Sequence, residues 1–365
     1  MTILILANND GGLYGFRREL IEALIEEGHT VVASVPGGLY IEKLRNLGCE
    51  LDICDSLERH GTNPLKELGL IHYYKKLLRR IRPDIVFTYT IKPNVYGGWL
   101  CGKMHIPYVV NITGLGTAVE NGGLMQCAML ILYRQGVKHA QKVFFQNAAN
   151  QDYMLAQRVI SGVYDLLPGS GVNVDYFPYQ SYDEHEGINF LTIGRLMRDK
   201  GTAEILEAAR VIKKKYTDVT FTFIGYVDDE QYRQKIEKAC EEGLVRYDGE
   251  QEDVKLYLRR CDALIHASYH EGLSNVLLEA ASSGRAVIAT DVPGCAETYV
   301  PDVTGIAFHA EDTNSLIGAI EKFLQLSDEQ RRKMGRLGRQ YVMENFDRRR
   351  VVDKYLMEVM ALKGK

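Results

Sequence analysis

The chain has 365 residues, of which 46% are hydrophobic and 25% are charged. These values are typical of a globular protein, and the length favours two domains over a single core. The net charge of −4 gives no sign of a nucleic-acid partner, and no run approaches the roughly 18 apolar residues of a membrane span. The cysteines are odd in number and never spaced C-x-x-C, which favours reduced thiols over disulfides or a zinc site.

The first half of the chain alternates between apolar runs and amphipathic stretches. Residues 3–7 are continuously apolar and lead directly into a polar, glycine-rich turn over residues 8–15, so they predict a buried parallel strand and not a signal peptide. Helices between such strands would complete a doubly wound α/β domain. The strands predicted in this half are residues 3–7, 29–35, 51–54, 85–89, 108–112, 143–146 and 163–167.

A second α/β pattern follows a linker. Residues 168–171 and 179–187 are rich in glycine, proline and polar side chains, which is typical of a domain boundary. We therefore predict two Rossmann-like domains, residues 1–178 and 187–346, and a C-terminal helix within 347–365. Ligands bind such sheets at the carboxyl ends of the strands, so facing domains would share a cleft. The later elements predicted are strands 188–193, 219–224, 245–247, 263–267, 286–289 and 305–308 and helices 201–214, 231–241, 313–326, 328–345 and 348–362.

The glycine-rich turn after the first strand is not a dinucleotide-binding fingerprint. Gly11, Gly12 and Gly15 do not follow the G-x-G-x-x-G pattern, and the second strand runs into Pro36 without the acidic residue that would bind a ribose. An NAD site is therefore disfavoured. Two interpretations stay open, namely a turn that lets the backbone approach a phosphate or sugar, and simple turn chemistry.

The stretch most informative about function is residues 270–280. It follows an apolar strand and opens a helix, with Glu271 at the turn and Glu279 inside the helix. Eight residues at about 1.5 Å of rise separate the two acids by roughly 12 Å, about the span from a sugar across a diphosphate to a ribose. Free N–H groups at the helix start would bind the phosphates. The stretch fits a grip for a nucleotide sugar, and an ordinary helix with an acidic start is the alternative.

Two cations follow the first strand of the second domain. Arg195 and Lys200 lie at the edge where such sheets bind ligands, and fixed cations there would neutralise a leaving diphosphate without a metal ion. The sequence has no Asp-x-Asp pair for a divalent ion, and the acidic residues 228–230 suit a helix start. We therefore predict no metal site.

Basic residues mark one side of a helix predicted over residues 65–82. Lys75, Lys76, Arg79 and Arg80 share this side, while apolar residues form the other. Such a helix suits an anionic membrane surface. A solvated charged face over the core is the open alternative.

Polar residues also follow the fourth and fifth strands. Lys92 and Asn94 come after the fourth strand and Thr113 comes after the fifth, so all three belong to the ligand edge of the first sheet. Lys92 is placed to contact a phosphate, although a single lysine at such a position is usually only a surface residue.

The order of these motifs resembles that of the family 4 retaining glycosyltransferases, which have the GT-B fold of two Rossmann-like domains. The first half is also similar to bacterial enzymes that add a sugar to an undecaprenyl-diphosphate-linked sugar. The family resemblance is carried by Gly194-Arg195 with Lys200-Gly201, by Glu271-Gly272-Leu273-Ser274-Asn275 with Glu279, and by residues 168–173. The second similarity is carried by Tyr14-Gly15-Phe16-Arg17, Asn63-Pro64, Lys92-x-Asn94 and Gly114-Leu115-Gly116.

The resemblance implies a role for each matching residue. Glu271 would face the donor sugar and Glu279 the ribose, while Arg195 and Lys200 would act on the diphosphate. The C-terminal helix over 347–365 would cross back onto the first domain. The implied donor-binding residues are Gly12, Gly194, Gly272, Leu273, Ser274, Asn275 and Glu279, and the acceptor-binding candidates are Tyr14, Arg17, Lys92, Asn94 and Thr113. Thr113 stands where many family members have a histidine near the donor sugar, so the resemblance leaves that sugar open.

The implied activity is retaining, metal-independent glycosyl transfer without a cofactor. A hexose, N-acetylhexosamine or uronic acid would move from a UDP-sugar to a lipid-diphosphate-linked sugar in the assembly of a bacterial surface glycan, such as a capsule. The implied location is cytoplasmic and peripheral on an anionic membrane surface. Two alternatives stay open: a nucleotide-sugar epimerase or hydrolase on the same fold, and a non-catalytic partner protein that has kept the fold.

Overall fold

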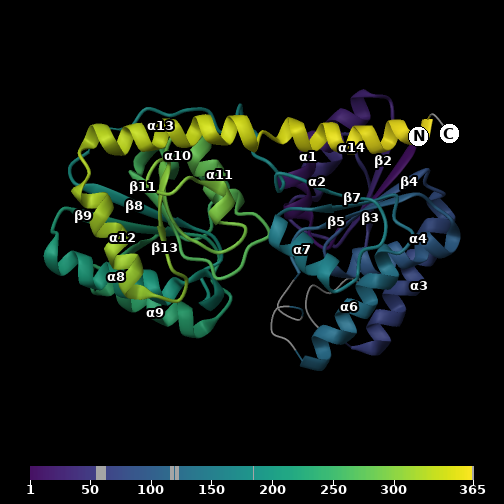
Figure 1. Ribbon diagram of the computed structural model, residues 1–365, viewed down its shortest axis with the longest axis horizontal. Helices are drawn as coiled ribbons and strands as arrows, with labels where there is room; N and C mark the ends of the chain where they lie inside the picture. Colours follow the sequence, from purple (N-terminus) through teal and green to yellow (C-terminus); the bar gives the residue numbers. More distant parts are fainter. Residues whose placement is uncertain (55–62, 116–118, 120–122, 184, 364–365) are drawn as a thin grey trace. The chain divides into compact units, whose positions relative to one another are not determined.

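The computed structural model describes residues 1–54, 63–115, 119, 123–183 and 185–363. They form two compact units, which are Met1–Ser170 with Arg348–Lys365 (unit 1) and Gly171–Asp347 (unit 2) (Figure 1). The sequence predicted that the first domain extends to residue 178. Residues 171–178 belong to unit 2 instead, because Val172, Val174 and Phe177 are buried in its core.

Unit 1 contains a seven-stranded parallel sheet in the order β3-β2-β1-β4-β5-β6-β7. Its strands are β1 Thr2–Leu6, β2 Thr30–Val35, β3 Glu50–Ile53, β4 Ile85–Tyr89, β5 Tyr108–Ile112, β6 Lys142–Phe145 and β7 Tyr164–Leu166. Its helices are α1 Asp10–Glu26, α2 Ile41–Asn46, α3 Pro64–Ile81, the π-helix η1 Pro93–Gly97, α4 Gly98–Met104, α6 Gly123–Val137, α7 Ala148–Ala156 and α14 Arg348–Lys363.

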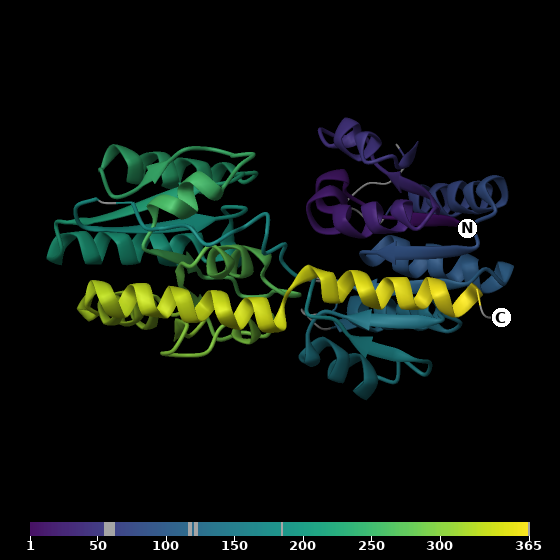
Figure 2. The ribbon, with the colours of Figure 1, turned by 90° about the horizontal axis from the view of Figure 1, so that it is seen from above.

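Alternate residues of these strands face two separate helical layers. Leu4 and Leu6 of β1 point into a core shared with α3, α4 and α6. Ile3 and Ile5 point into the core on the opposite face, shared with α1 and α14. The last helix, α14, therefore lies along the sheet of unit 1 (Figure 2), where the buried ring of Tyr355 contacts the sheet.

Unit 2 contains a six-stranded parallel sheet in the order β10-β9-β8-β11-β12-β13. Its strands are β8 Ile188–Ile193, β9 Val219–Ile224, β10 Arg246–Tyr247, β11 Ala263–His266, β12 Ala286–Thr290 and β13 Gly305–Phe308. Its helices are η2 Arg198–Lys200, α8 Thr202–Lys215, α9 Glu230–Glu241, α10 Lys255–Arg260, α11 Asn275–Ser282, η3 Ala296–Thr298, α12 Thr313–Gln325 and α13 Asp328–Asn345. The α/β prediction is confirmed, and every predicted strand is present within one residue at each end.

The first helix begins earlier than the sequence suggested. The stretch predicted as a turn over residues 8–15 is mostly the start of α1, which begins at Asp10. The reason is a helix cap: the Asn9 side chain accepts a hydrogen bond from the Gly12 N–H. Within the described parts of the chain, no helix is both long and apolar enough to cross a membrane.

Candidate active site

The turn between β11 and α11 carries the two-acid stretch. The sequence predicted a helix that opens close to Glu271, but α11 begins only at Asn275, with Ser274 as the N-cap residue. The Ser274 N–H donates to the Gly294 carbonyl at 2.8 Å, which holds the turn out of helical geometry. The separation estimated from helical rise therefore applies only from Asn275 to Glu279, and not over the turn that carries Glu271.

Glu271 and Lys200 form the centre of the site. Lys200 Nζ donates to Glu271 Oε1 and also to Ser268 Oγ at 3.2 Å. His266 Nε2 lies 3.0 Å from the same Glu271 oxygen. The Lys200 and Glu271 side chains are 22% and 17% exposed, so the ion pair is largely shielded from water but still open on one side. The two sequence motifs thus meet in space.

The loop that carries Lys200 reaches β11 because of Gly201. Its φ is +63°, and a Cβ at this position would lie 2.3 Å from the carbonyl oxygen of Ala267. A larger residue would clash with that backbone and push the loop away. The Tyr269 N–H also donates to the Asp199 carbonyl at 2.9 Å, which ties the two loops together.

Gly294 supports the turn from the other side. Its φ is +85°, and a Cβ there would lie 2.5 Å from the carbonyl oxygen of Glu271. No sequence pattern points to Gly294, since its contact with Glu271 depends on how the loop after β12 returns to the site. It is a residue of the site that sequence reasoning missed.

His266 is a second residue that sequence reasoning missed. It is buried at the end of β11, and its Nε2 lies 3.1 Å from Ser274 Oγ as well as close to Glu271. An ionised carboxylate only accepts hydrogen bonds, so Nε2 carries the hydrogen that it shares with Glu271. Ser274 is turned toward His266 and makes no side-chain cap bond to α11. One imidazole therefore orients both the acid and the residue that precedes the helix.

The charge of Glu271 is fixed by its surroundings. Burial raises its pKa, but the hydrogen bond from His266 and the charge of Lys200 outweigh burial and lower the pKa to about 2. Glu271 is therefore a carboxylate at neutral pH, and it stands beside a fixed cation. Among the described residues, no three His, Cys, Asp or Glu side chains gather as a metal site.

The other predicted site residues of unit 2 are near Lys200 or Glu271 in the sequence. Gly194 directly follows β8 with a φ of +143°, a backbone conformation that favours glycine, and the half-exposed Arg195 comes next. The Glu271 carboxylate contacts Lys200 and His266. Leu273 is buried, whereas Gly272, Asn275 and Glu279 are half-buried, and the Asn275 side-chain oxygen has no hydrogen-bond partner.

The acceptor-binding candidates of unit 1 lie in different environments. Asn94 is buried, and its side chain bonds to Thr88 Oγ1 and to the Asn111 carbonyl, each at 2.8 Å. We therefore assign Asn94 to the core. The Lys92 ammonium already pairs with Glu67 at 2.7 Å.

Arg17 is buried on α1. Its guanidinium lies 4.8 Å from the centre of the Tyr89 ring, and its Nε has no hydrogen-bond partner. Tyr14 stacks with Tyr40 at 5.6 Å between ring centroids, and Thr113 is half-exposed after β5. Arg17 Nη1 also donates to the Phe16 carbonyl at 2.8 Å, and Tyr14 is half-exposed.

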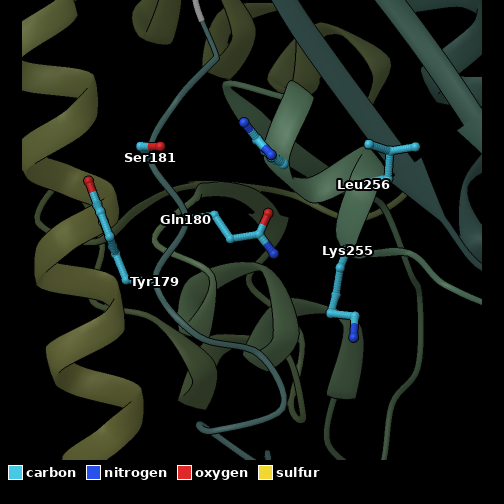
Figure 3. Close-up of a pocket in the computed structure, with 6 residues that line it drawn as sticks. Tyr179, Gln180, Ser181, Lys255 and Leu256 are labelled. Atoms are coloured by element: carbon cyan, nitrogen blue, oxygen red, sulfur yellow. The ribbon is translucent and has the colours of Figure 1, made fainter.

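A cavity of about 500 Å³ lies elsewhere in unit 2 (Figure 3). It forms between the segment that carries Tyr179, Gln180 and Ser181 and the helix α10 with Lys255 and Leu256. None of the predicted site residues lines it. Its two cations already have partners, because Arg259 pairs with Asp183 at 2.8 Å and Lys255 stacks on Tyr176. We assign no ligand to this cavity.

Two protein families match the chain, one in each half. The family described as Glycosyl transferase 4-like domain matches residues 11–168, and the family described as Glycosyl transferases group 1 matches residues 180–341. The second match contains Lys200, His266, Glu271 and Glu279, so the ion-pair cluster lies within the part of the chain that the group 1 family describes.

Among characterised proteins, the chain is 26% identical to the N,N'-diacetylbacillosaminyl-diphospho-undecaprenol alpha-1,3-N-acetylgalactosaminyltransferase of Campylobacter jejuni, over 89% of this chain and 90% of that protein. It is 25% identical to the capsular polysaccharide biosynthesis glycosyltransferase CapM of Staphylococcus aureus, over 82% and 84% of the two chains. The structure of Anabaena Alr3699/HepE in complex with UDP and glucose matches with a TM-score of 0.80 at 16% identity, covering 99% of each chain. That structural match shows a shared fold.

Proposed function

We propose, from the premise that this chain is a glycosyltransferase built of a 4-like and a group 1 domain, that it moves a sugar from UDP to a lipid-diphosphate-linked sugar. The sugar would be a hexose, an N-acetylhexosamine or a uronic acid, and the reaction would retain the anomeric configuration. The product would be an intermediate of a bacterial surface glycan. The relative in Campylobacter jejuni, whose name specifies a diphospho-undecaprenol acceptor, supports this acceptor class.

The observation that carries the proposal is the cluster of Lys200, His266 and Glu271. A carboxylate held in one orientation can accept hydrogen bonds from the hydroxyls of a bound sugar. An ammonium beside it can stabilise the negative charge that develops on a departing diphosphate. Both groups lie at the carboxyl edge of the unit 2 sheet, where α/β domains bind ligands.

The start of α11 provides the natural place for the diphosphate. Ser274 is held by His266 and does not cap the helix, so its side chain leaves the N–H groups of the first turn to a ligand. The helix dipole favours an anion at this end. Glu279, one turn into the same helix, would then accept hydrogen bonds from the ribose hydroxyls.

The proposed reaction uses the leaving group as the base. The bond between the anomeric carbon and the diphosphate oxygen breaks, and the departing oxygen accepts the proton of the acceptor hydroxyl. That hydroxyl oxygen forms the new bond on the same face of the sugar. Lys200 and Arg195 stabilise the charge on the diphosphate, so the protein contributes positioning and electrostatics, and no carboxylate nucleophile is needed.

We further propose that unit 1 binds the acceptor at the cytoplasmic membrane surface. Arg17, Tyr14 and Thr113 are the residues of unit 1 that we retain for this role. Arg80 is paired with Asp52, so we retain Lys75, Lys76 and Arg79, the exposed cations toward the end of α3, for an anionic surface.

A screen of UDP-sugars for protection against thermal unfolding would test the donor. The true donor should raise the unfolding temperature by mass action, and turnover with a short-chain polyprenyl-diphosphate sugar should follow. UDP release that needs no acceptor would instead favour a hydrolase or an epimerase. The absence of any UDP-sugar effect, in protein shown to be folded, would contradict the proposal.

Replacing Glu279 with alanine should weaken UDP binding without changing the fold. Loss of hydrogen bonds to a charged group costs about 1.5–3 kcal/mol, so the Kd for UDP should rise by roughly 10- to 150-fold. Calorimetric titration with UDP would measure this. Glu237→Ala, an exposed position on α9, serves as the control. Equal UDP affinity in the Glu279 variant would rule out the ribose role.

Replacing His266 with alanine should lower kcat by about 100-fold, since a small misplacement of a reacting group has an effect of that size. The KM for the donor should change less, because Lys200 and α11 remain. His266→Gln keeps an N–H donor and should recover part of the rate. His309→Ala, an exposed histidine, is the matched control. A loss in the glutamine variant equal to that in alanine would contradict the positioning role.

A further inference from the structure

A second side-chain bond joins the two segments that carry Lys200 and Glu271. The Tyr269 hydroxyl donates a hydrogen bond to Glu204 Oε1 at 2.6 Å. Tyr269 lies in the turn after β11, two residues before Glu271. Glu204 lies in the first turn of α8, four residues after Lys200. The Glu204–Tyr269 bond therefore connects the same two segments as the central ion pair does, at a different point along each of them.

The Tyr269 side chain is held firmly in this position. Only 9% of the residue is exposed. Burial, followed by the hydrogen bond to Glu204, raises the pKa of the Tyr269 hydroxyl well above its ordinary value, so the hydroxyl keeps its proton at neutral pH and is the donor. The Tyr269 N–H also donates to the Asp199 carbonyl at 2.9 Å. The backbone and the side chain of Tyr269 thus both bind the segment that carries Lys200.

The need for stability does not explain this pair of residues. Glu204 Oε2 is buried and has no hydrogen-bond partner in the part of the chain that the structure describes. A buried oxygen without a partner costs stability, whereas two apolar side chains of similar shape would fill the space without that cost. A glutamate and a tyrosine instead provide direction, because their hydrogen bond fixes the distance and angle between the two segments.

The position of the Lys200 ammonium depends on both segments. Its Nζ donates to Ser268 Oγ at 3.2 Å as well as to Glu271, and Ser268 is the residue directly before Tyr269. Lys200 itself ends the short helix η2, and Gly201, with a left-handed backbone, separates it from α8. A shift of the start of α8 against the turn after β11 would therefore move the ammonium relative to the Glu271 carboxylate.

We propose that Glu204 and Tyr269 are positioning residues for the transfer reaction, because their bond holds the Lys200 ammonium where the diphosphate departs. The inference rests on the proposed function for the role of Lys200. Neither side chain has to touch the donor. Loss of the bond should therefore lower kcat, since a small displacement of a charge-stabilising group slows the reaction steeply, and should change the KM for the donor much less.

Single substitutions in the full chain test the bond by steady-state kinetics, with the donor found in the UDP-sugar screen. Tyr269→Phe removes only the hydroxyl and should lower kcat about tenfold, less than the roughly 100-fold cost of a 1 Å misplacement. Glu204→Leu should have the same effect. Glu204→Gln keeps an oxygen that accepts the hydrogen bond and should keep most of the rate. Equal kcat in the leucine and glutamine variants would contradict the proposal.

Tyr182→Phe is the matched control for loss of a hydroxyl. The half-buried Tyr182 donates from its hydroxyl to the Gly284 carbonyl at 3.0 Å, in another part of unit 2. This control should keep the wild-type kcat. A tenfold loss of kcat in it would overturn the assignment to Tyr269, because any missing hydroxyl in unit 2 would then have the same effect.

A paired apolar variant separates positioning from stability. Glu204→Leu combined with Tyr269→Phe removes both partners of the bond and leaves no unpaired buried oxygen at this place. We expect this variant to unfold at or above the wild-type temperature while its kcat stays about tenfold lower. A structural role alone predicts that kcat recovers together with stability. A wild-type kcat in the paired variant would overturn the proposal.

A double-mutant cycle shows whether the bond acts through Lys200. Tyr269→Phe should lower kcat about tenfold in the wild-type background but less than twofold in the Lys200→Ala background, because the group that the bond positions is then missing. The same tenfold loss in both backgrounds would overturn the proposal.

Two further results distinguish this inference from the proposed function. If Lys200→Ala lowers kcat and the Tyr269 variants do not, the inference fails and the proposed function stands. If no donor and acceptor give transfer, the proposed function fails, and the same cycle is measured by unfolding temperature. A shift for Tyr269→Phe that is smaller in the Lys200→Ala background would then support the link to Lys200, and equal shifts would overturn it.

Discussion

Replacing Lys200 with alanine should lower kcat by about 100- to 1000-fold, the effect of removing one preorganised group that stabilises transition-state charge. Lys200 contacts Glu271 directly. It lies in the loop that follows β8, beside the proposed diphosphate site. Its removal takes away a cation and also leaves the Glu271 carboxylate without its counter-charge. Steady-state kinetics with the donor found by the UDP-sugar screen would measure the change.

The control for charge is Lys214→Ala on the exposed side of α8, which should leave kcat unchanged. Arg195→Ala is the informative companion variant. It should also lower kcat by about 100-fold, since it removes a second cation from the same edge of the sheet. Arg195 is half-exposed, so this variant should unfold close to the wild-type temperature, whereas Lys200→Ala removes the partner of a largely shielded carboxylate and should unfold earlier. Undiminished turnover in the Lys200 variant would remove Lys200 from the mechanism.

The sequence predicted the strands well because most of the buried parallel strands are predominantly apolar runs between polar turns. Residues 85–89 and 188–193 are examples, and both runs coincide with observed strands. The position of Lys200 and Glu271 at one edge also followed from the sequence, since the carboxyl ends of parallel strands lie on the same side of a sheet. The direct contact between Lys200 and Glu271 was not predictable in this way, because it depends on the close approach of two loops that Gly201 permits.

Other parts of the site depend on contacts between residues far apart in the chain. His266 ends an apolar strand, where a histidine is as often a core residue as a functional one, so the sequence alone gave no reason to select it. Gly294 matters only because its backbone touches that of Glu271. Asn94 is the opposite case. It was predicted as an acceptor-binding residue, but its side chain forms hydrogen bonds within the core.

Helix starts and exposed apolar faces were the least predictable local features. Because Asn9 caps α1, the helix begins at Asp10. This start lies within a glycine-rich stretch that was predicted to be a turn. The exposed leucines of α3 were not distinguishable from core leucines by composition, because the helix has apolar residues on both sides. In the structure Leu70, on the predicted apolar side, is buried, and Leu68 is exposed.

Replacing Glu271 with glutamine should destabilise the protein at neutral pH, and the loss should shrink as the pH falls. The pKa of Glu271 in the folded chain is about 2, below its ordinary value of 4.5. A carboxyl with a lowered pKa stabilises the folded state above its unfolded pKa, and this contribution disappears as the pH falls through the folded pKa. The shift corresponds to about 3 kcal/mol, which the glutamine variant would lack because it carries no charge.

Urea unfolding of the wild type and of Glu271→Gln at several pH values would measure this difference. We expect the gap in unfolding free energy to be constant above pH 5 and to narrow steadily between about pH 4.5 and 2. Glu237→Gln, an exposed position on α9, should show no gap at any pH and corrects for the general effect of acid. A gap that stays constant down to pH 2.5 would mean that Glu271 titrates at its ordinary value. In that case Lys200 and His266 would not hold the charge of Glu271 as the observed contacts require, and the cluster would be a structural contact without the fixed anion on which the proposed sugar contact depends.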